Sequence, residues 1–250
     1  MAKRGITIAI IAVAGIAAAR PAIAGHPMLT EDTGTQGTGN FELELGYSWA
    51  RDGGDRFFVF QPQLSYGLTP SLDLIAQPSW LSNDTTADSR VHGLGDTALD
   101  VKWRFFGSDP FSLAVRAGAT LATSENDLGL PSGTVATHAT LVATLDVAPF
   151  TIDANLGYAR NPDAAGLRRS LYHASAAALY ACTERLSFVI DMDADSNADT
   201  SRSMWPAVAL LGAIYTLRPG LDIDAGYRKS LNSAAAATQW LLGITYRWAP

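Results

Sequence analysis

Two pairs of aspartates are the first side chains in this sequence whose spacing could support chemistry. Asp191 and Asp193, and likewise Asp222 and Asp224, are separated by a single residue. On an extended strand this spacing places both carboxylates on one face, where they could bind a cation or act as an acid–base couple. A glycosidase also uses two carboxyl groups about 5 to 9 Å apart, but nothing else in the sequence supports that chemistry. Ion pairing with arginines of neighbouring strands is the favoured interpretation.

His173 and Ser175 form the second candidate, a histidine and a serine on one strand face. The spacing is similar to that of the outer-membrane phospholipase, which is also a twelve-stranded barrel. A serine nucleophile needs a base that a third group orients, and in that enzyme an asparagine on the next strand orients the histidine. The strand expected next, 186–194, contains no asparagine, and Asn197 lies beyond it. A membrane-embedded hydrolase is the alternative hypothesis, and two polar wall residues are the favoured interpretation.

The first residues have the form of a secretory signal. Lys3 and Arg4 precede an apolar run at 6–19, and residues 22–24 have the small-x-small form of a cleavage site. The apolar run is shorter than the roughly twenty residues that a membrane-spanning helix needs. We therefore expect residues 1–24 to be a signal peptide that directs export.

Charge and cysteine content disfavour several classes of protein. The full chain has a net charge of −6, and removal of the basic signal makes it more negative, which disfavours nucleic-acid binding. The single cysteine, Cys182, cannot form an intramolecular disulfide. His92 and His138 have no partners at metal-ligand spacing, and no glycine-rich phosphate loop precedes a helix. Neither a metal nor a cofactor is therefore expected.

Apolar and polar residues alternate strictly in several segments. Although 48% of the residues are hydrophobic, no stretch after the signal approaches the length of a membrane helix. In residues 41–50 and again in 99–105, large apolar side chains occupy every second position. This period of two is typical of a strand with one apolar and one polar face. In a bilayer such strands must close into a barrel, because closure satisfies every backbone group.

The alternation predicts an all-β fold, namely a twelve-stranded antiparallel transmembrane β-barrel. The barrel is expected at 39–250, after a periplasmic N-terminal segment at 25–38. An even number of strands places both ends of the barrel on the periplasmic side, and each expected strand is long enough to cross a bilayer at a tilt. The strands are expected at 39–51, 56–67, 71–82, 96–106, 111–123, 136–147, 150–159, 171–181, 186–194, 205–216, 221–230 and 238–248.

Short turns alternate with longer polar connections, as in outer-membrane barrels with short periplasmic turns and long external loops. A soluble β-barrel, with its apolar side chains inside, is the alternative fold. Aromatic residues near the strand ends favour the membrane barrel because they fit interfacial girdles. The short turns are expected at 68–70, 107–110, 148–149, 182–185 and 217–220, and the longer loops at 83–95, 124–135, 160–170, 195–204 and 231–237.

The polar face of the strands is rich in charge. One hypothesis is a selectivity field along a pore. The favoured interpretation is a set of ion pairs and hydrogen bonds that fills a narrow lumen. The lumen-facing candidates are Glu42, Glu44, Asp73, Asp100, Lys102, Arg104, Arg116, Asp153, Asp191, Asp193, Asp222, Asp224, Arg228 and Arg247.

Local motifs along the chain follow one another in a recognisable order. They are His26 to Gly37, Gly93 to Asp96 with the following strand, Leu130 to Gly133, Asn155 to Tyr158, Thr183 to Leu186, and Leu221 to Leu231. In this order they resemble the family of outer-membrane barrels described as Putative MetA-pathway of phenol degradation. The resemblance implies a channel for hydrophobic or aromatic solutes. The chain departs from outer-membrane barrels in general at its end, where Ala249 and Pro250 follow the aromatic Trp248 that the assembly machinery usually reads.

We therefore expect an outer-membrane channel or facilitator for small hydrophobic or aromatic solutes, without enzymatic activity and with loops 83–95 and 124–135 at its mouth. Its expected partners are outer-membrane lipid, the barrel-assembly machinery and a small-molecule solute, but not nucleic acid. The alternatives are a phospholipase-like hydrolase that uses His173 and Ser175, and a structural barrel with a closed lumen.

Overall fold

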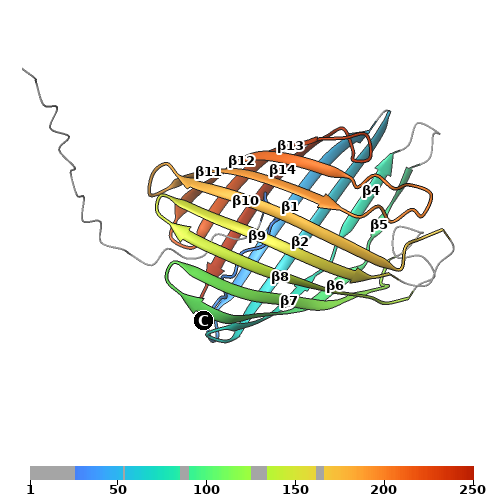
Figure 1. Cartoon of the computed structure of the whole chain (residues 1–250). Coiled ribbons are helices and arrows are strands. Elements are labelled where there is room, and N and C mark those ends of the chain that lie inside the picture. The colour runs from blue at the N-terminus through green and yellow to red at the C-terminus, as the bar shows by residue number, and fades with distance from the viewer. Residues whose placement is uncertain (1–25, 53, 85–89, 125–133, 162–165) are drawn as a thin grey trace, which may run out of the picture.

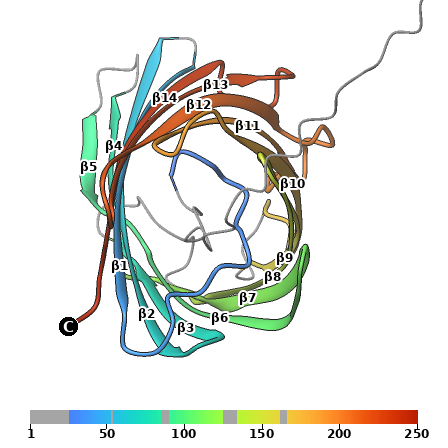
Figure 2. The ribbon, with the colours of Figure 1, turned by 90° about the vertical axis from the view of Figure 1, so that its left-hand side faces the viewer.

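Antiparallel strands close into a barrel, and the end-on view in Figure 2 shows the wall as a ring. The structure is a computed structural model that describes residues 26–52, 54–84, 90–124, 134–161 and 166–250 (Figure 1). The expected signal at 1–24 lies outside the described residues. Within them, no helix is long and apolar enough to cross a membrane.

The wall closes because β1 (Phe41–Asp52) pairs with both β2 (Asp55–Thr69) and β14 (Thr238–Trp248). The 14 strand segments of the described residues occupy twelve positions around the wall, since two positions hold two segments each. The predicted twelve-stranded barrel is confirmed. The uninterrupted strands between the two interrupted positions and β14 are β7 (Phe111–Leu121), β8 (Ala136–Val147), β9 (Phe150–Arg160), β10 (Ser170–Ala181), β11 (Leu186–Asp195), β12 (Ala207–Arg218) and β13 (Leu221–Ser230).

The third and fourth positions are each divided in two. β3 (Leu72–Gln77) is followed by β4 (Trp80–Asp84), and β5 (Arg90–Leu94) by β6 (Thr97–Ser108). Pro78 lacks a backbone N–H and interrupts the first of these strands. The expected loop 83–95 is therefore wrong in its boundaries, because β4 and β5 pair with each other through much of it.

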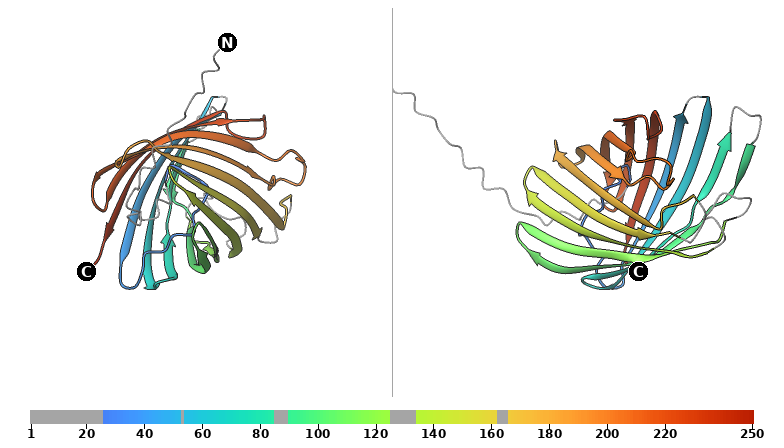
Figure 3. Two further views of the ribbon diagram at one scale, coloured as in Figure 1. Left: turned by 60° about the vertical axis from the view of Figure 1, so that its left-hand side comes forward. Right: turned by 45° about the vertical axis from the view of Figure 1, so that its right-hand side comes forward.

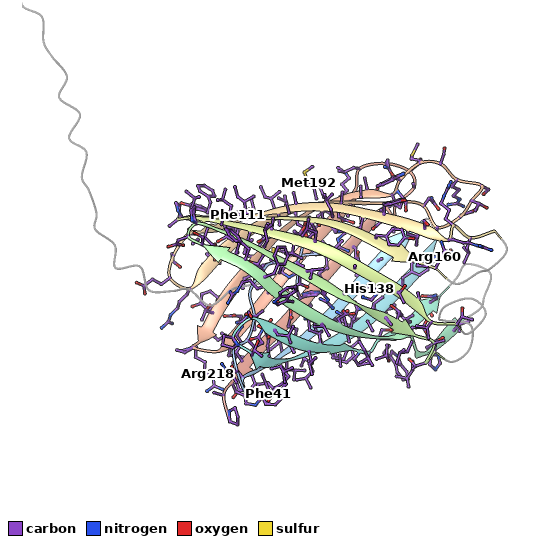
Figure 4. The ribbon with its side chains drawn as sticks, turned by 60° about the horizontal axis from the view of Figure 1, so that its bottom comes forward. Phe41, Phe111, His138, Arg160, Met192 and Arg218 are labelled. Carbon is purple, nitrogen blue, oxygen red and sulfur yellow. The ribbon has the colours of Figure 1, made fainter. Side chains whose placement is uncertain are left out.

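The apolar face of the wall points outward. Leu99 and Val101 of β6 are 46% and 41% exposed, whereas Asp100 between them is 5% exposed. Figure 4 shows Phe111 and Met192, two further exposed apolar residues, on the outer surface of the barrel. A soluble barrel would have the opposite arrangement, because water would surround its outer face. The soluble-barrel alternative is therefore wrong.

The short connections lie at one end of the barrel. Only two to four residues join β2 to β3, β6 to β7, β8 to β9, β10 to β11 and β12 to β13. Phe41 and Arg218 lie at this end in Figure 4, and Arg160 lies at the opposite end. In outer-membrane barrels the end with short turns faces the periplasm. The strands run obliquely between the two ends, as both views in Figure 3 show, and this tilt is typical of closed barrels.

Residues 26–40 run inside the barrel. Figure 2 shows this N-terminal segment, in dark blue, within the ring before it joins β1. Thr30, Asp32 and Thr33 are 1%, 4% and 3% exposed. The sequence predicts a periplasmic segment at 25–38 and leaves open whether it enters the barrel; in the structure its described residues lie in the lumen. The physical reason is that acids on the inner wall are buried and need hydrogen-bond donors, which the segment supplies.

Glycines in the wall make room for the N-terminal segment. A side chain on Gly67 of β2 would overlap the carbonyl oxygen of Gly37, and a side chain on Gly226 of β13 would meet Pro27. The segment therefore lies closer to these strands than any residue with a Cβ would permit.

A small apolar cluster lies between the segment and the inner wall. Met28 of the segment is buried with Leu210 of β12 and Leu241 of β14. Burial of such side chains contributes about 25 cal/mol for each Å² removed from water, so the cluster stabilises the docked segment. The remaining members of the cluster are Ala177, Leu179, Val189 and Ile214.

The orientation of β6 can be tested by placing one arginine on either face. Val101→Arg puts a charge on the lipid-facing side, which costs about 2–4 kcal/mol near the bilayer midplane. Ala98→Arg puts the same charge on the polar side. We expect Val101→Arg to lower the folded fraction in lipid vesicles far more than Ala98→Arg does, as measured by gel mobility and urea titration. Equal losses would contradict the assigned faces.

Candidate functional site

Two cations of the wall hold the acids of the N-terminal segment. Lys102 of β6 donates to Glu31 Oε1 at 2.7 Å and to Asp32 Oδ1 at 3.2 Å. Arg116 of β7 donates to Glu31 Oε2 at 2.6 Å and to Asp100 Oδ2 at 2.8 Å. None of these side chains is more than 17% exposed, so solvent screens the ion pairs little.

The ion pairs fix the charge of Glu31. Burial alone would raise the pKa of this carboxyl, but the charges of Lys102 and Arg116, and their hydrogen bonds, lower the pKa from 4.5 to about 2. Because the folded pKa lies below the unfolded value, Glu31 stabilises the docked segment fully above about pH 4.5. That stabilisation is lost as the pH falls toward about 2.

Acids of the wall also accept hydrogen bonds from the segment's backbone. Asp191 of β11 accepts from the N–H groups of Leu29 and Thr30 at 2.6 and 3.2 Å, and from the Thr30 hydroxyl at 2.6 Å. Asp73 of β3 accepts from the N–H of Gln36 at 3.0 Å. These carboxylates receive from the segment the donors that water would otherwise supply.

Both ends of the segment are held by side chains as well. The N–H of His26 donates to Glu44 Oε2 at 3.2 Å, and the Nδ1 of His26 lies 2.6 Å from Asp224 Oδ1. Ten residues later, the amide of Gln36 donates to Glu42 Oε1 at 2.8 Å. The segment is thus anchored to β1 at two points and to β13, which is separated from β1 only by β14.

Asn155 of β9 holds the middle of the segment through its backbone. In the amide orientation that satisfies both groups, Asn155 donates to the Glu31 carbonyl oxygen at 3.0 Å and accepts from the Glu31 N–H at 2.6 Å. Nearby, the N–H of Thr33 donates to the Thr144 hydroxyl at 3.0 Å, and that hydroxyl donates to Asp153 at 2.6 Å. A chain of hydrogen bonds therefore connects the segment to a fully buried carboxylate.

The charged residues placed in the lumen from the sequence fall into three groups. Asp100, Asp153, Asp222 and Arg247 support the residues that contact the segment, whereas Arg104, Asp193 and Arg228 lie apart from it. The residues that contact the segment directly are Glu42, Glu44, Asp73, Lys102, Arg116, Asp191 and Asp224.

The pairing expected for the aspartate pair of β13 is only partly present. Arg247 lies 2.6 Å from Asp222, as expected, and also contacts Glu42. Asp224 instead contacts His26 of the segment. Among the described residues, no carboxylate lies within ion-pair distance of Arg228.

Sequence reasoning missed the partners that the wall residues bind. Glu31, Asp32 and His26 lie in the N-terminal segment, to which the sequence assigned no contacts. Asn155 was noted only as part of a family motif. The one available signal was the concentration of hydrogen-bonding side chains in residues 26–40. Strand periodicity says nothing about such a segment, because the segment is not a strand.

Within the described part of the lumen, two cavities border the segment, one along residues 31–36 and the other along residues 26–31. The cavity nearer the short turns has a volume of about 400 Å³ and is bordered by Phe41 and Trp248. The other has a volume of about 440 Å³. Glu31, Glu44 and Gln63 border both cavities, so the two meet at the docked segment.

His173 and Ser175 gain a third partner in the structure. The Nε2 of His173 lies 3.1 Å from the Ser175 Oγ, and the Nδ1 lies 2.8 Å from Asp195 Oδ1. The next strand offers no asparagine to orient His173, as the sequence indicated, but the register of β10 and β11 places Asp195 opposite the histidine instead. Ser175 is 8% exposed and shares the inner face of the wall, so it does not reach the lipid-facing surface.

The same corner of the lumen offers a set of metal-ligating atoms that the sequence did not indicate. Ligand atoms of His173, Asp193 and Asp195 lie within 4.8 Å of one another. An imidazole and two carboxylates suit Zn²⁺ or a similar divalent ion. Both ring nitrogens of His173 already have partners, Asp195 and Ser175, so the group is organised as a hydrogen-bonded chain.

The closed wall, apolar outer face and polar lumen define an outer-membrane β-barrel. The family described as Putative MetA-pathway of phenol degradation matches residues 24–248. The chain belongs to this family, which confirms the resemblance carried by its motifs. No curated protein matches the sequence.

Solved structures of outer-membrane proteins share the fold. An outer membrane channel from Pseudomonas putida F1 has a TM-score of 0.73 at 12% identity, over 87% of this chain and 98% of that chain. The NanC porin and the KdgM porin have TM-scores of 0.58 and 0.57, each at 11% identity over 82% of this chain and 98% of theirs. The predicted location in the outer membrane is confirmed.

Hydrogen exchange of residues 26–36 tests the role of Glu31. Glu31→Gln removes the charge that Lys102 and Arg116 share, and hydrogen bonds to charged groups contribute about 1.5–3 kcal/mol each. We expect exchange of the segment to accelerate about tenfold or more, as measured by mass spectrometry at neutral pH. Glu184→Gln, in the exposed turn after β10, is the matched control and should have no effect. Unchanged protection in Glu31→Gln would show that the ion pairs do not hold the segment.

Proposed function

We propose that this protein is a passive outer-membrane channel for small aromatic or otherwise largely hydrophobic solutes that carry a polar group, and that it is not an enzyme. The observation that supports the proposal is the pair of cavities that meet at the docked segment. Volumes of about 400 and 440 Å³ suit a molecule the size of one substituted ring. The family description and the channel-like fold agree with a role in transport.

The lining of the larger cavity restricts the solutes that suit it. Met28, Val59 and Leu241 are apolar, and they lie among amides and hydroxyls. A solute with an apolar ring and a polar substituent satisfies both kinds of lining, whereas a bare hydrocarbon leaves the polar groups without partners. The polar lining residues without formal charge are Thr30, Ser48, Gln61, Gln63, Gln77, Thr140, Asn155 and Gln239.

The remaining partners follow from the two surfaces of the barrel. The exposed apolar side chains of the wall suit contact with outer-membrane lipid. Insertion of such a barrel would depend on the barrel-assembly machinery. The net negative charge argues against nucleic acid as a partner.

Deletion of residues 26–36 tests whether the segment narrows the path. The deletion removes the border between the two cavities, so we expect single-channel conductance in planar bilayers to rise severalfold. Deletion of residues 233–236, in the loop before β14, is a control that leaves both cavities intact and should not change conductance. If the wild type carries no current and only the deletion variant conducts, the closed structural barrel is favoured. If neither the wild type nor the deletion variant conducts, the channel is contradicted.

A hydrolase is the second candidate, and the chain of Asp195, His173 and Ser175 is the observation that favours it. An acyl-transfer site also needs donors for the developing oxyanion. The strand around Ser175 pairs with both β9 and β11, so its backbone amides belong to the sheet and do not converge on the serine. A lipid ester would moreover have to enter the lumen to reach Ser175.

Ser175→Ala separates the two functions. Because transport depends on the lumen and hydrolysis on one activated oxygen, we expect the variant to keep the uptake of a small aromatic acid within twofold of wild type. Release of fatty acid from phospholipid and hydrolysis of a water-soluble ester are measured in parallel. Ser48→Ala, at another buried serine bordering the same lumen, is the matched control. Ester hydrolysis that disappears only in Ser175→Ala would overturn the channel in favour of the hydrolase.

A further inference from the structure

Arg228 of β13 is a buried arginine with unused hydrogen-bond donors. It is 9% exposed and borders the cavity of about 440 Å³. Its Nη1 donates to Gln239 Oε1 at 2.8 Å. Its Nε and Nη2 are buried, and neither has a hydrogen-bond partner among the described residues. Leaving such donors unsatisfied costs about 1–3 kcal/mol each, and more for a charged group, so a partner for them is expected.

The two unused donors form a fork. Nε and Nη2 lie on the same edge of the planar guanidinium, and their N–H bonds point in nearly the same direction. This edge matches the two oxygens of a carboxylate, which binds an arginine with two parallel hydrogen bonds. Gln239 holds Nη1 on the other side of the group and so fixes the direction of the fork.

The other charged side chains of this cavity already have partners. Arg116 binds Glu31 and Asp100, and Glu44 accepts from His26 and Gln63. The Asp191 carboxylate, which attracts Arg228 from beyond ion-pair distance, accepts three hydrogen bonds from the segment.

His138 and His173 of the same cavity contact Asp100 and Asp195. Asp193, like Asp191, attracts Arg228 from beyond ion-pair distance. Of the two arginines that line this cavity, Arg116 forms ion pairs, whereas no described carboxylate lies within ion-pair distance of Arg228.

Apolar side chains lie beside the fork. The strand register places Leu210 of β12 opposite Arg228 on one side and Gln239 of β14 opposite it on the other. Leu241, the next inward residue of β14, belongs with Leu210 and Met28 to the apolar cluster, and both Met28 and Leu241 border the cavity. A molecule whose carboxylate binds the fork can therefore rest its hydrocarbon part on this cluster.

We infer that Arg228, Gln239, Leu241 and Met28 form a binding subsite for a monocarboxylate attached to an apolar ring. The inference rests on the proposed function and names its solute class, an aromatic acid as opposed to a neutral aromatic or a small hydrophilic acid. The fork selects the carboxylate, because a neutral amide has one acceptor oxygen and no charge. The apolar cluster selects the ring, because only a ring gains from leaving water there.

The test compares three probes on the folded mature protein in detergent by titration calorimetry. The probes are benzoate, benzamide, which is its neutral counterpart, and acetate, which lacks the ring. We expect benzoate to bind at least tenfold more tightly than either of the others. In planar bilayers, benzoate should reduce the single-channel current at concentrations that match its Kd.

Two variants and two matched controls locate the subsite. Arg228→Gln should weaken benzoate about tenfold or more and leave benzamide unchanged, whereas Leu241→Ala should weaken benzoate and leave acetate unchanged. Arg218→Gln changes an exposed arginine at the end of β12, and Leu242→Ala changes a leucine that is 58% exposed on the outer face. Both controls should bind benzoate as wild type does.

If gel mobility shows that Arg228→Gln does not fold, Arg228→Lys takes its place in the experiment. Lysine keeps the charge but lacks the parallel donors, so benzoate should still bind more weakly than to wild type. Unchanged affinity in a folded Arg228 variant, or equal affinity of wild type for benzoate and benzamide, would overturn the subsite. If the wild type conducts ions but does not bind benzoate, the channel is supported and the subsite is contradicted. If benzoate binds in an Arg228-dependent way but the protein conducts no ions, the subsite is supported and the channel is contradicted.

Discussion

The burial of carboxylates on the inner wall is the constraint on which the rest of this structure depends. The outer face must be apolar to contact lipid, and because side chains alternate along a strand, polar residues accumulate on the inner face. Twelve strands enclose a lumen so narrow that Asp73, Asp153 and Asp191 are at most 2% exposed. A buried carboxylate requires donors, and residues 26–40 supply them to Asp73 and Asp191. The segment thus belongs to the hydrogen-bond network of the inner wall. Without it, carboxylates such as Asp73 and Asp191 would lack these donors.

The same constraint explains why one arginine stands out. Arg116 lies between two acids, and Arg247 likewise lies between two acids, so both are neutralised within the protein. Arg228 makes no hydrogen bond with the segment among the described residues and lies next to an amide and an apolar cluster that includes Met28. Lys102, Arg116 and Arg247 each contact carboxylates, whereas no described carboxylate lies within ion-pair distance of Arg228, and this difference supports the proposed ligand site. The unpaired guanidinium edge and the apolar cluster together suit a solute with one charged end and one apolar end.

Strand period and turn spacing were sufficient to predict the barrel, its closure and the direction of its side chains. The reason is that contact with lipid requires an apolar side chain at every second position of each strand. The interruption between β3 and β4 was less visible, although Pro78 is its cause. The ion pair between Glu31 and Lys102 and the contact between Asp195 and His173 could not be predicted, because no local sequence pattern encodes such tertiary contacts. The alternation placed the charges on the polar face, but it contained no information about their partners.

The sequence separation of the lumen contacts has a consequence for how the molecule is made. His26 and Asp224 are 198 residues apart in the chain, and Leu29 and Asp191 are separated by 162 residues. These contacts of His26 and Leu29 require β13 and β11, which follow much later in the chain, and a high share of such long-range contacts slows folding. β1 must also find β14 before the ring is complete. The hydrogen bonds that hold residues 26–36 in the lumen thus come from wall strands of both halves of the chain, so a complete docking of this segment requires the whole ring.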